Sequence, residues 1–291
     1  MPSLIDVQLD GAVATITLRN AARRNAMTRA MWRALRAVAV SIHSPEQSSA
    51  EHDSSEINSF SRNIPLGYSP IRCVIIQGEA GHFCAGGDIS EYPDFRFNET
   101  SLRAFHEDEV APALHALLAL DMPLLAQIEG NCMGGGLEIA ACCDIRIAGL
   151  GAVFGAPIAK LGMPMAPEEL AIVLRAAGEA TVREMLLEAR SFSAQKMLER
   201  GFVQRVVGDD AVANEAQASA KRICKLSPQA ARLNKQALRQ LCKVNTPVAQ
   251  WNVAGAAINN VVTAENPYAY ASSAEHKEGI TAFLEKRSAQ F

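Results

Sequence analysis

Apolar and polar residues alternate at the start of the chain, and this pattern predicts a β-hairpin. The alternation covers residues 5–9 and 12–18, with Asp10-Gly11 between them. Asp-Gly between two alternating segments is a strong hairpin signal, because these residues tolerate the positive φ angles of a tight turn. Apolar residues then recur at helical spacing over 26–42. We therefore expect a helix to follow the hairpin.

Three apolar segments predict buried strands further along the chain, at 71–78, 124–129 and 144–148. The first two lead into glycine-rich loops, and helices are expected after the loops at 101–120 and from Leu137. This order predicts crossover connections and a largely parallel sheet. The remaining chain has mainly helical periodicity, at 168–177, 181–187, 193–200, 210–226, 228–241 and 273–287, with a strand-like break at 201–207.

This pattern divides the chain into a core domain, 1–205, and a helical C-terminal region, 206–291. Residues 44–69 interrupt the core domain, since they are serine-rich and acidic and show no periodicity. A long segment without structure is unusual inside a compact domain. We interpret it as a surface insertion, either passive or covering a site or subunit contact.

Composition narrows the classes of function. The chain has 291 residues, of which 49% are hydrophobic, and its net charge of −3 gives no basic field for nucleic acid. Seven cysteines without paired metal-ligand spacing indicate reduced thiols, no metal site and a cytoplasmic location. No signal peptide is expected, because the N-terminus has neither a basic nor an apolar region. The longest apolar tract, 111–128, is interrupted by polar residues, so no membrane span is expected.

The stretch 129–144 contains the clearest candidate chemistry. Three glycines, Gly134 to Gly136, precede a helix-forming run that places Glu138 in its first turn. Glycines let a backbone approach a ligand, and the free N–H groups of a helix N-terminus attract negative charge. A carboxylate beside such donors suggests chemistry on a carbonyl group, in which an oxyanion forms while a proton moves. The alternative is that the glycines serve close strand–helix packing.

A second glycine loop, Phe83-Cys84-Ala85-Gly86-Gly87-Asp88, also follows a strand. The two loops together resemble those of the crotonase superfamily, the enoyl-CoA hydratase/isomerase family. Further segments that resemble the family are 24–27, 143–148, 154–155, 193–195, 201–203 and 278–287. The resemblance implies an α/β fold, a spiral of ββα units with a helical C-terminal region that mediates trimers or dimers of trimers.

The resemblance also implies a site. The N–H groups of Ala85 and Gly135 would form an oxyanion hole for an acyl-CoA thioester carbonyl, and Glu138 would transfer protons. Coenzyme A would enter as part of the substrate, with no other cofactor. Residues implied in substrate or CoA binding are Arg24, Ala26, Cys84, Gly86, Asp88, Ile89, Gly134, Ile158, Phe283 and Lys286.

Several of these residues also have structural interpretations. Asp88 is suited to capping the following helix rather than touching substrate. Arg24 and Lys286 are solvated charges in the alternative interpretation, and Phe283 is better suited to the core than to an adenine platform.

The chain departs from the family pattern at Ile158, where hydratases carry a second glutamate. Isoleucine cannot transfer a proton, and one acid–base group is worth about 10²–10⁴ in rate. Glu168 and Glu169 follow shortly after and suit the positive end of a helix, although one of them could supply a substitute base. Three further candidates near the acyl pocket, Glu91, Asp94 and His106, are each expected to face solvent.

The leading hypothesis is an acyl-CoA enzyme that hydrates an enoyl-CoA or moves its double bond. Another crotonase reaction (decarboxylation, hydrolysis or C–C bond cleavage or formation) uses the same enolate stabilisation. A different class, an acyl-CoA-binding relative with little catalysis, is consistent with Ile158 but not with a retained Glu138. Nucleotide binding is excluded, because the glycines lack the Lys-Ser/Thr of a P-loop and the spacing of a dinucleotide fingerprint.

Overall fold

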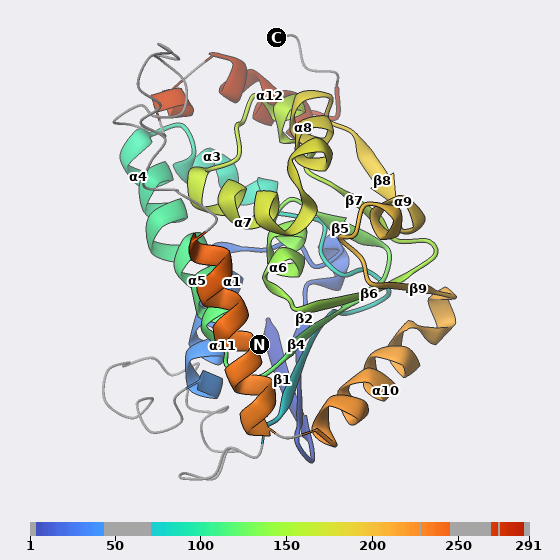
Figure 1. The fold of residues 1–291 in the computed structure, drawn as a ribbon. Helices are drawn as coiled ribbons and strands as arrows, with labels where there is room; N and C mark the ends of the chain where they lie inside the picture. The colour runs from blue at the N-terminus through green and yellow to red at the C-terminus, as the bar shows by residue number, and fades with distance from the viewer. Residues whose placement is uncertain (1–3, 44–70, 227, 245–268, 273, 288–291) are drawn as a thin grey trace.

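The computed structural model describes residues 4–43, 71–226, 228–244, 269–272 and 274–287 (Figure 1). The insertion expected at 44–69 lies outside the described residues, and its role stays a prediction. Within the described part of the chain, no helix is both long and apolar enough to cross a membrane.

The main sheet has six strands in the order β1-β2-β3-β4-β6-β9. β1 and β2 are antiparallel, and every other neighbouring pair is parallel. Gly11 has a φ of +57° in the β1–β2 turn, which confirms the hairpin. The expectation of a largely parallel sheet is also confirmed. The strands are β1 (Ile5–Asp10), β2 (Val13–Leu18), β3 (Cys73–Gly78), β4 (Leu124–Ile128), β6 (Ile145–Gly149) and β9 (Arg205–Val207).

A second sheet was not anticipated from the sequence. It contains β5 (Asn131–Met133), β7 (Val153–Gly155) and β8 (Ser191–Ser193), in the order β5-β7-β8. Each strand has three residues, which is too short for alternation to be recognised. The turn from β4 into β5 carries the chain from the main sheet to this second sheet, and the glycine triplet Gly134 to Gly136 follows β5 directly.

Eleven labelled helices surround the sheets in the described residues: α1 (Arg29–His43), α3 (Tyr92–Phe95), α4 (Glu99–Ala104), α5 (Ala111–Ala119), α6 (Gly135–Cys142), α7 (Pro167–Ala177), α8 (Glu179–Leu187), α9 (Ala194–Glu199), α10 (Val212–Cys224), α11 (Pro228–Val244) and α12 (Ala274–Leu284). Short helical segments are η1 (Ala21–Arg23), η2 (Ile89–Glu91), η3 (Phe105–Val110), η4 (Pro157–Leu161), η5 (Asp209–Ala211) and η6 (Ala269–Ser272).

The single helix expected over 101–120 is corrected by the structure. The segment forms α4, then the π-helical η3, then α5. A π turn holds an extra residue and shifts the side chains that follow, and such turns are frequent at functional sites. Arg29 and Arg33 of α1 hold this turn through the buried carboxylate of Glu109, at 2.5 and 3.0 Å.

The two faces of the main sheet have different covers. One face packs on α10, where Val212, Ala216 and Ala220 contact side chains of β2, β3, β4 and β6. The other face packs into the larger core that includes α1, α5 and α6, and Figure 1 shows α10 and the pair α1–α5 on opposite sides. These covers account for the continuous apolar runs of β3 and β4, which are buried on both faces.

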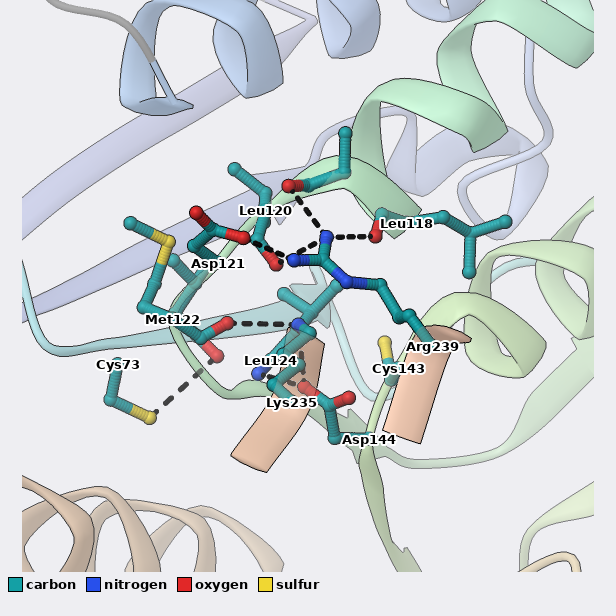
Figure 2. A network of polar contacts seen from close by, with 12 residues as sticks. Cys73, Leu118, Leu120, Asp121, Met122, Leu124, Cys143, Asp144, Lys235 and Arg239 are labelled. Atoms are coloured by element: carbon teal, nitrogen blue, oxygen red, sulfur yellow. Dashed lines mark hydrogen bonds and ion pairs between the residues drawn. The ribbon is translucent and has the colours of Figure 1, made fainter. Parts of the chain in front are cut away.

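Helix α11 is joined to the α5–β4 connection and to Asp144 by an ionic network that we call the anchor cluster: Asp121, Asp144, Lys235, Gln236 and Arg239. Figure 2 shows Asp121, Asp144, Lys235 and Arg239 of this cluster. Lys235 Nζ lies 2.7 Å from Asp144 Oδ2 and donates to the Met122 carbonyl at 2.9 Å. Arg239 pairs with Asp121 and donates to the carbonyls of Leu118 and Ala119 at 2.9 and 2.8 Å. The helix thus satisfies carbonyls at the end of α5 that have no intrahelical partner.

Helix α12 packs against η4. Gly279 lies so close to this segment that a Cβ there would be 2.1 Å from the carbonyl carbon of Leu161. The helical character predicted for the C-terminal region is seen in α10, α11 and α12. Its division from the core at residue 205 and its role in trimerisation stay predictions.

Candidate active site

The two glycine loops lie side by side and are joined by backbone hydrogen bonds. The N–H groups of Phe83 and Cys84 donate to the carbonyls of Glu129 and Asn131, at 2.7 and 2.8 Å. Met133 N–H returns a bond to the Cys84 carbonyl at 2.9 Å. Loops 50 residues apart in the chain therefore form one rigid platform.

Glycine is required where the loops touch. A Cβ at Gly136 would lie 2.6 Å from the Cys84 carbonyl oxygen, a backbone atom that cannot move aside. Gly134 has a φ of +46° and a ψ of −115° just before α6, a conformation that other residues rarely adopt. The close-packing interpretation of the triplet is thus right, and it is compatible with a site at the same place.

Two backbone N–H groups on this platform belong to residues that line one cavity. Gly135 is the first residue of α6, so its N–H has no intrahelical acceptor. Gly87 sits opposite Met27 in a parallel bridge that uses the N–H groups of Met27 and Asp88 instead of its own. Both glycines line the cavity, and neither N–H has a hydrogen-bond partner among the described residues.

This geometry corrects the placement of one predicted donor. The N–H of Ala85 donates to the Arg24 carbonyl at 3.0 Å, and Ala85 does not line the cavity. Gly86, between the two positions, has a φ of +106°, and Ala85 and Gly87 face different surroundings. The available donor is Gly87, two residues from the one expected.

The cavity combines apolar walls with the side chains of one arginine, one histidine and two glutamates. Its lining residues are Trp32, Gly87, Tyr92, Arg96, Phe105, His106, Val110, Gly134, Gly135, Glu138, Ile158, Met163, Pro164, Met165, Ala166 and Glu169. Predicted residues Gly134, Gly135, Glu138 and Ile158 are all brought together here. Glu138 comes from the first turn of α6 and Ile158 from η4.

The environment of Glu138 disfavours its ionised form. Burial, followed by the negative charge of Glu169, raises the pKa of Glu138 to about 8, and the positive charge of Arg96 offsets part of the shift. A carboxyl group in an apolar cavity beside a like charge retains its proton at neutral pH. Perturbed carboxyl groups in cavities are candidates for proton transfer.

A second carboxyl group shares the cavity. Glu169 is in the first turn of α7 as expected, but its side chain is only 2% exposed, and its Oε1 lies 2.8 Å from His106 Nδ1. Glu168, its neighbour, is 56% exposed and pairs with His115. The helix-end interpretation therefore holds for Glu168 and is incomplete for Glu169.

The three candidates near the acyl pocket have different outcomes. His106 is buried and lines the cavity, so its expected exposure is wrong. Glu91 accepts a hydrogen bond from the Arg29 N–H at 2.8 Å, and Asp94 is exposed. Sequence reasoning missed Arg96, whose guanidinium contacts both His106 and His276 at 3.4 Å, because no motif marks it.

The remaining predicted site residues lie outside the cavity lining. Asp88 caps η2 as expected, since its carboxylate accepts from Ser90 N at 3.1 Å, and it also pairs with Arg23 at 2.9 Å. Ala26, Cys84 and Gly86 are buried in the platform, and Ile89 is partly buried. Burial raises the pKa of the Cys84 thiol to about 12, which leaves it protonated.

The predicted CoA-binding side chains lie at the surface. Arg24 and Lys286 are exposed. Phe283 is 54% exposed, so its expected place in the core is wrong. The reason is the register of α12, which buries Ile280 and Ala282 and turns Phe283 outward. The six cysteines with described side chains are free thiols, and no group of three or more metal-ligating side chains occurs in the described part of the chain.

Comparison with known proteins shows the family of this chain. The sequence profile of the enoyl-CoA hydratase/isomerase family matches residues 68–291. A Mycobacterium tuberculosis protein named "Probable enoyl-CoA hydratase" is 33% identical over 76% of this chain and 80% of its own. This chain belongs to the enoyl-CoA hydratase/isomerase family.

Two further proteins have a comparable sequence identity to this chain. The 2,3-dehydroadipyl-CoA hydratase of Escherichia coli is 31% identical over 76% of this chain and 81% of its own. The crystal structure of an enoyl-CoA hydratase/carnithine racemase from Magnetospirillum magneticum is 33% identical, with a TM-score of 0.73, and covers all of this chain and 96% of that one. The predicted crotonase fold is confirmed by this similarity.

Proposed function

We propose that this protein is an acyl-CoA-transforming enzyme that adds water to a 2-enoyl-CoA thioester. The single observation that carries the proposal is the pair of unpartnered N–H groups, on Gly87 and Gly135, at a cavity that also holds Glu138. The relatives named as enoyl-CoA and 2,3-dehydroadipyl-CoA hydratases support the substrate class.

The thioester carbonyl would accept hydrogen bonds from the two N–H groups. Attack at Cβ moves electron density onto the carbonyl oxygen, and preorganised donors stabilise this enolate. Each donor of this kind contributes about 10²–10³ in rate. Glu138, protonated at neutral pH because its pKa is raised to about 8, is in the state to deliver a proton to Cα.

The same proposal covers the parts of the substrate outside the cavity. Coenzyme A would enter as part of the substrate, with the exposed cations Arg24 and Lys286 available to its phosphates. The apolar walls formed by Phe105, Val110 and Met165 suit the acyl chain. A homotrimer or dimer of trimers in the cytoplasm belongs to the proposal as well, and size-exclusion chromatography with light scattering tests the assembly.

A panel of 2-enoyl-, 3-enoyl- and malonyl-type CoA thioesters tests the reaction. We expect turnover of 2-enoyl-CoA, measured as loss of the conjugated enoyl absorbance, and a decrease in kcat of about 10²–10⁴ in Glu138→Gln. The matched control is Glu168→Gln, the same change at a carboxylate that is 56% exposed, which should keep wild-type activity.

The outcomes separate the alternatives. Preference for 3-enoyl thioesters would make the protein an isomerase, and preference for malonyl-type thioesters a decarboxylase. Binding of thioesters without turnover would support a weakly catalytic relative. If Glu138→Gln is as fast as the wild type, the role assigned to Glu138 is wrong.

A further inference from the structure

A second carboxyl group faces the cavity from an element that the family pattern does not mark. The family pattern places the second glutamate at Ile158, which here contributes only an apolar wall. Glu169 enters the same cavity eleven residues later, from the first turn of α7. Consecutive helical residues point about 100° apart, because a helix turns once in 3.6 residues. Glu169 therefore faces inward while Glu168 faces solvent.

Glu169 is held by a hydrogen-bond chain. Its Oε1 lies 2.8 Å from His106 Nδ1, and the Nε2 of that imidazole lies 3.4 Å from Arg96 Nη1. Arginine has only donors, so the imidazole nitrogen that faces it must accept. The proton of a neutral His106 is then on Nδ1 and is donated to Glu169, which accepts it as a carboxylate.

A second histidine, His276, also accepts a hydrogen bond from Arg96 through its Nε2. Arg96 Nε donates to His276 Nε2 at 3.4 Å, and His276 Nδ1 lies 3.2 Å from the Ala271 carbonyl, which accepts. Burial lowers the pKa of His106, and burial together with Arg96 lowers the pKa of His276 to about 4. Both imidazoles are therefore neutral near pH 7, in agreement with the hydrogen-bond directions.

The charges around the cavity place one proton on two carboxyl groups. Ionisable groups that act on this site come from several elements: Arg96, His106, Glu107, Glu138, Glu169 and His276. The hydrogen-bond chain favours ionised Glu169, whereas burial and the charge of Glu169 favour protonated Glu138. Two carboxyl groups whose environments separate their protonation states are suited to act as an acid and a base.

We propose that Glu169 is the second catalytic carboxylate of this site, acting as the general base while Glu138 acts as the acid. His106 is a positioning residue that holds Glu169 through its Nδ1–H. This inference rests on the proposed hydration of an enoyl-CoA. It assigns to α7 a function that the family pattern places at the position of Ile158.

In the proposed hydration, each carboxyl group transfers one proton. Glu169 takes a proton from water as the water oxygen forms a bond to Cβ. The π electrons of the Cα–Cβ double bond move into the thioester, whose oxygen is held by Gly87 and Gly135. The enolate then takes the proton of Glu138 at Cα. Transfer of the new proton from Glu169 to Glu138 restores the starting state.

Glutamine substitution with a short-chain trans-2-enoyl-CoA thioester as substrate tests the proposal. We expect Glu169→Gln to lower kcat by about 10²–10⁴, with KM changed only a few-fold, while Glu168→Gln keeps wild-type kinetics. The wild-type pH profile of kcat/KM should have an alkaline limb near pH 8, where Glu138 loses its proton. Glu169→Gln should shift this alkaline limb to lower pH, because the charge that helps to raise the pKa of Glu138 is removed.

Variants of His106 provide a second test of the proposal, which does not require that the Glu169→Gln variant folds. His106→Gln retains an amide N–H for Glu169 and should keep more activity than His106→Leu, which has none. Equal kcat values in these two variants would overturn the positioning role. Wild-type kcat in Glu169→Gln, or a loss expressed in KM alone, would overturn the catalytic role and leave the proposed hydration intact.

A titration separates this inference from the proposed function. Carboxyl ¹³C NMR of Glu138 needs no substrate, and removing the charge of Glu169 should lower the pKa of Glu138 from its value of about 8. An unchanged pKa would overturn the shared-proton arrangement. If the wild type hydrates no enoyl thioester, the base role of Glu169 fails together with the proposed function.

Discussion

Two groups of ionisable side chains lie in different parts of this molecule and follow opposite electrostatic rules. In the anchor cluster, two cations meet two carboxylates, through Lys235–Asp144 and Arg239–Asp121. The cavity instead holds two carboxyl groups, those of Glu138 and Glu169. Arg96 is the permanent positive charge that acts on Glu138, since both neighbouring histidines are neutral. One group pairs opposite charges, and the other places two carboxyl groups in one cavity, where Glu138 retains its proton.

The pKa shifts follow from this difference. Burial acts to raise the pKa of Asp121, but hydrogen bonds from Arg239 and Gln236 outweigh it and lower the pKa below its usual range. Burial also raises the pKa of Glu138, and there the nearest carboxylate adds to the effect instead of opposing it. Paired charges secure a helix, whereas an uncompensated carboxyl group retains a proton that chemistry can use.

Changing the shape of the cavity without changing its charges should have a large effect on activity. A Cβ at Gly87 would lie 2.1 Å from Tyr92 Oη, and the next Tyr92 atom is 3.1 Å away. Gly87→Ala should therefore displace the donor and lower kcat/KM by up to about 10²-fold, because small misplacements have effects of that size.

A double variant sharpens this test. Adding Tyr92→Phe to Gly87→Ala removes the oxygen that clashes and should recover most of the loss, with Tyr92→Phe alone as the reference. The measurement is steady-state hydration of an enoyl-CoA thioester. A double variant no faster than Gly87→Ala would show that the clash with Tyr92 is not the cause.

Breaking the anchor cluster should affect stability and leave chemistry intact. Lys235→Met leaves Asp144 without its ion pair and the Met122 carbonyl without a donor. The free energy of unfolding should fall by roughly 1–3 kcal/mol, the range for partly buried groups that lose a charged hydrogen bond. Urea unfolding at fixed protein concentration measures this, and kcat of the folded enzyme should not change.

Lys196→Met is the matched control for this prediction. Lys196 lies 2.8 Å from Glu199, but both side chains are about half exposed, at 46% and 52%. Exposed pairs contribute little, so the change should stay within about 0.5 kcal/mol. Similar losses in the two variants would contradict the distinction between anchoring and surface pairs.

The two regions also differ in how much of them the sequence predicts. Periodicity and turn chemistry predict the hairpin, β3, β4 and α7, and the glycine loops predict Gly135 and Glu138. The donor Gly87 was missed by two positions, because only the three-dimensional course of the loop decides which N–H already has an acceptor. Glu168 and Glu169 are indistinguishable from sequence, since their difference is the rotation of α7 relative to the cavity.

Long-range contacts explain the remaining differences. Arg96 directly follows α3, in a segment that the sequence predicts as a loop, and His106 lies in η3, which the sequence predicts as regular helix. The π turn of η3 changes which side chains face inward. His276 reaches Arg96 from α12, 180 residues further along the chain. The anchor cluster likewise joins α11 to residues more than 90 positions earlier, and no local pattern encodes such pairings.

A further expected effect is on the pH dependence of stability, and it tests the environment of the buried carboxyl group of Glu138 directly. Glu138 has a pKa of about 8 when folded against an ordinary value of 4.5. Between these values the folded protein binds more protons than the unfolded chain, so the unfolding free energy falls as pH rises. Glu138→Gln should remove this decline, so the difference in unfolding free energy between variant and wild type should grow from about pH 5 to pH 8. The neutral histidines act in the opposite direction below about pH 6.5 and cancel in the comparison. Urea denaturation at four pH values measures the difference, and a constant difference would show that Glu138 ionises normally in the cavity.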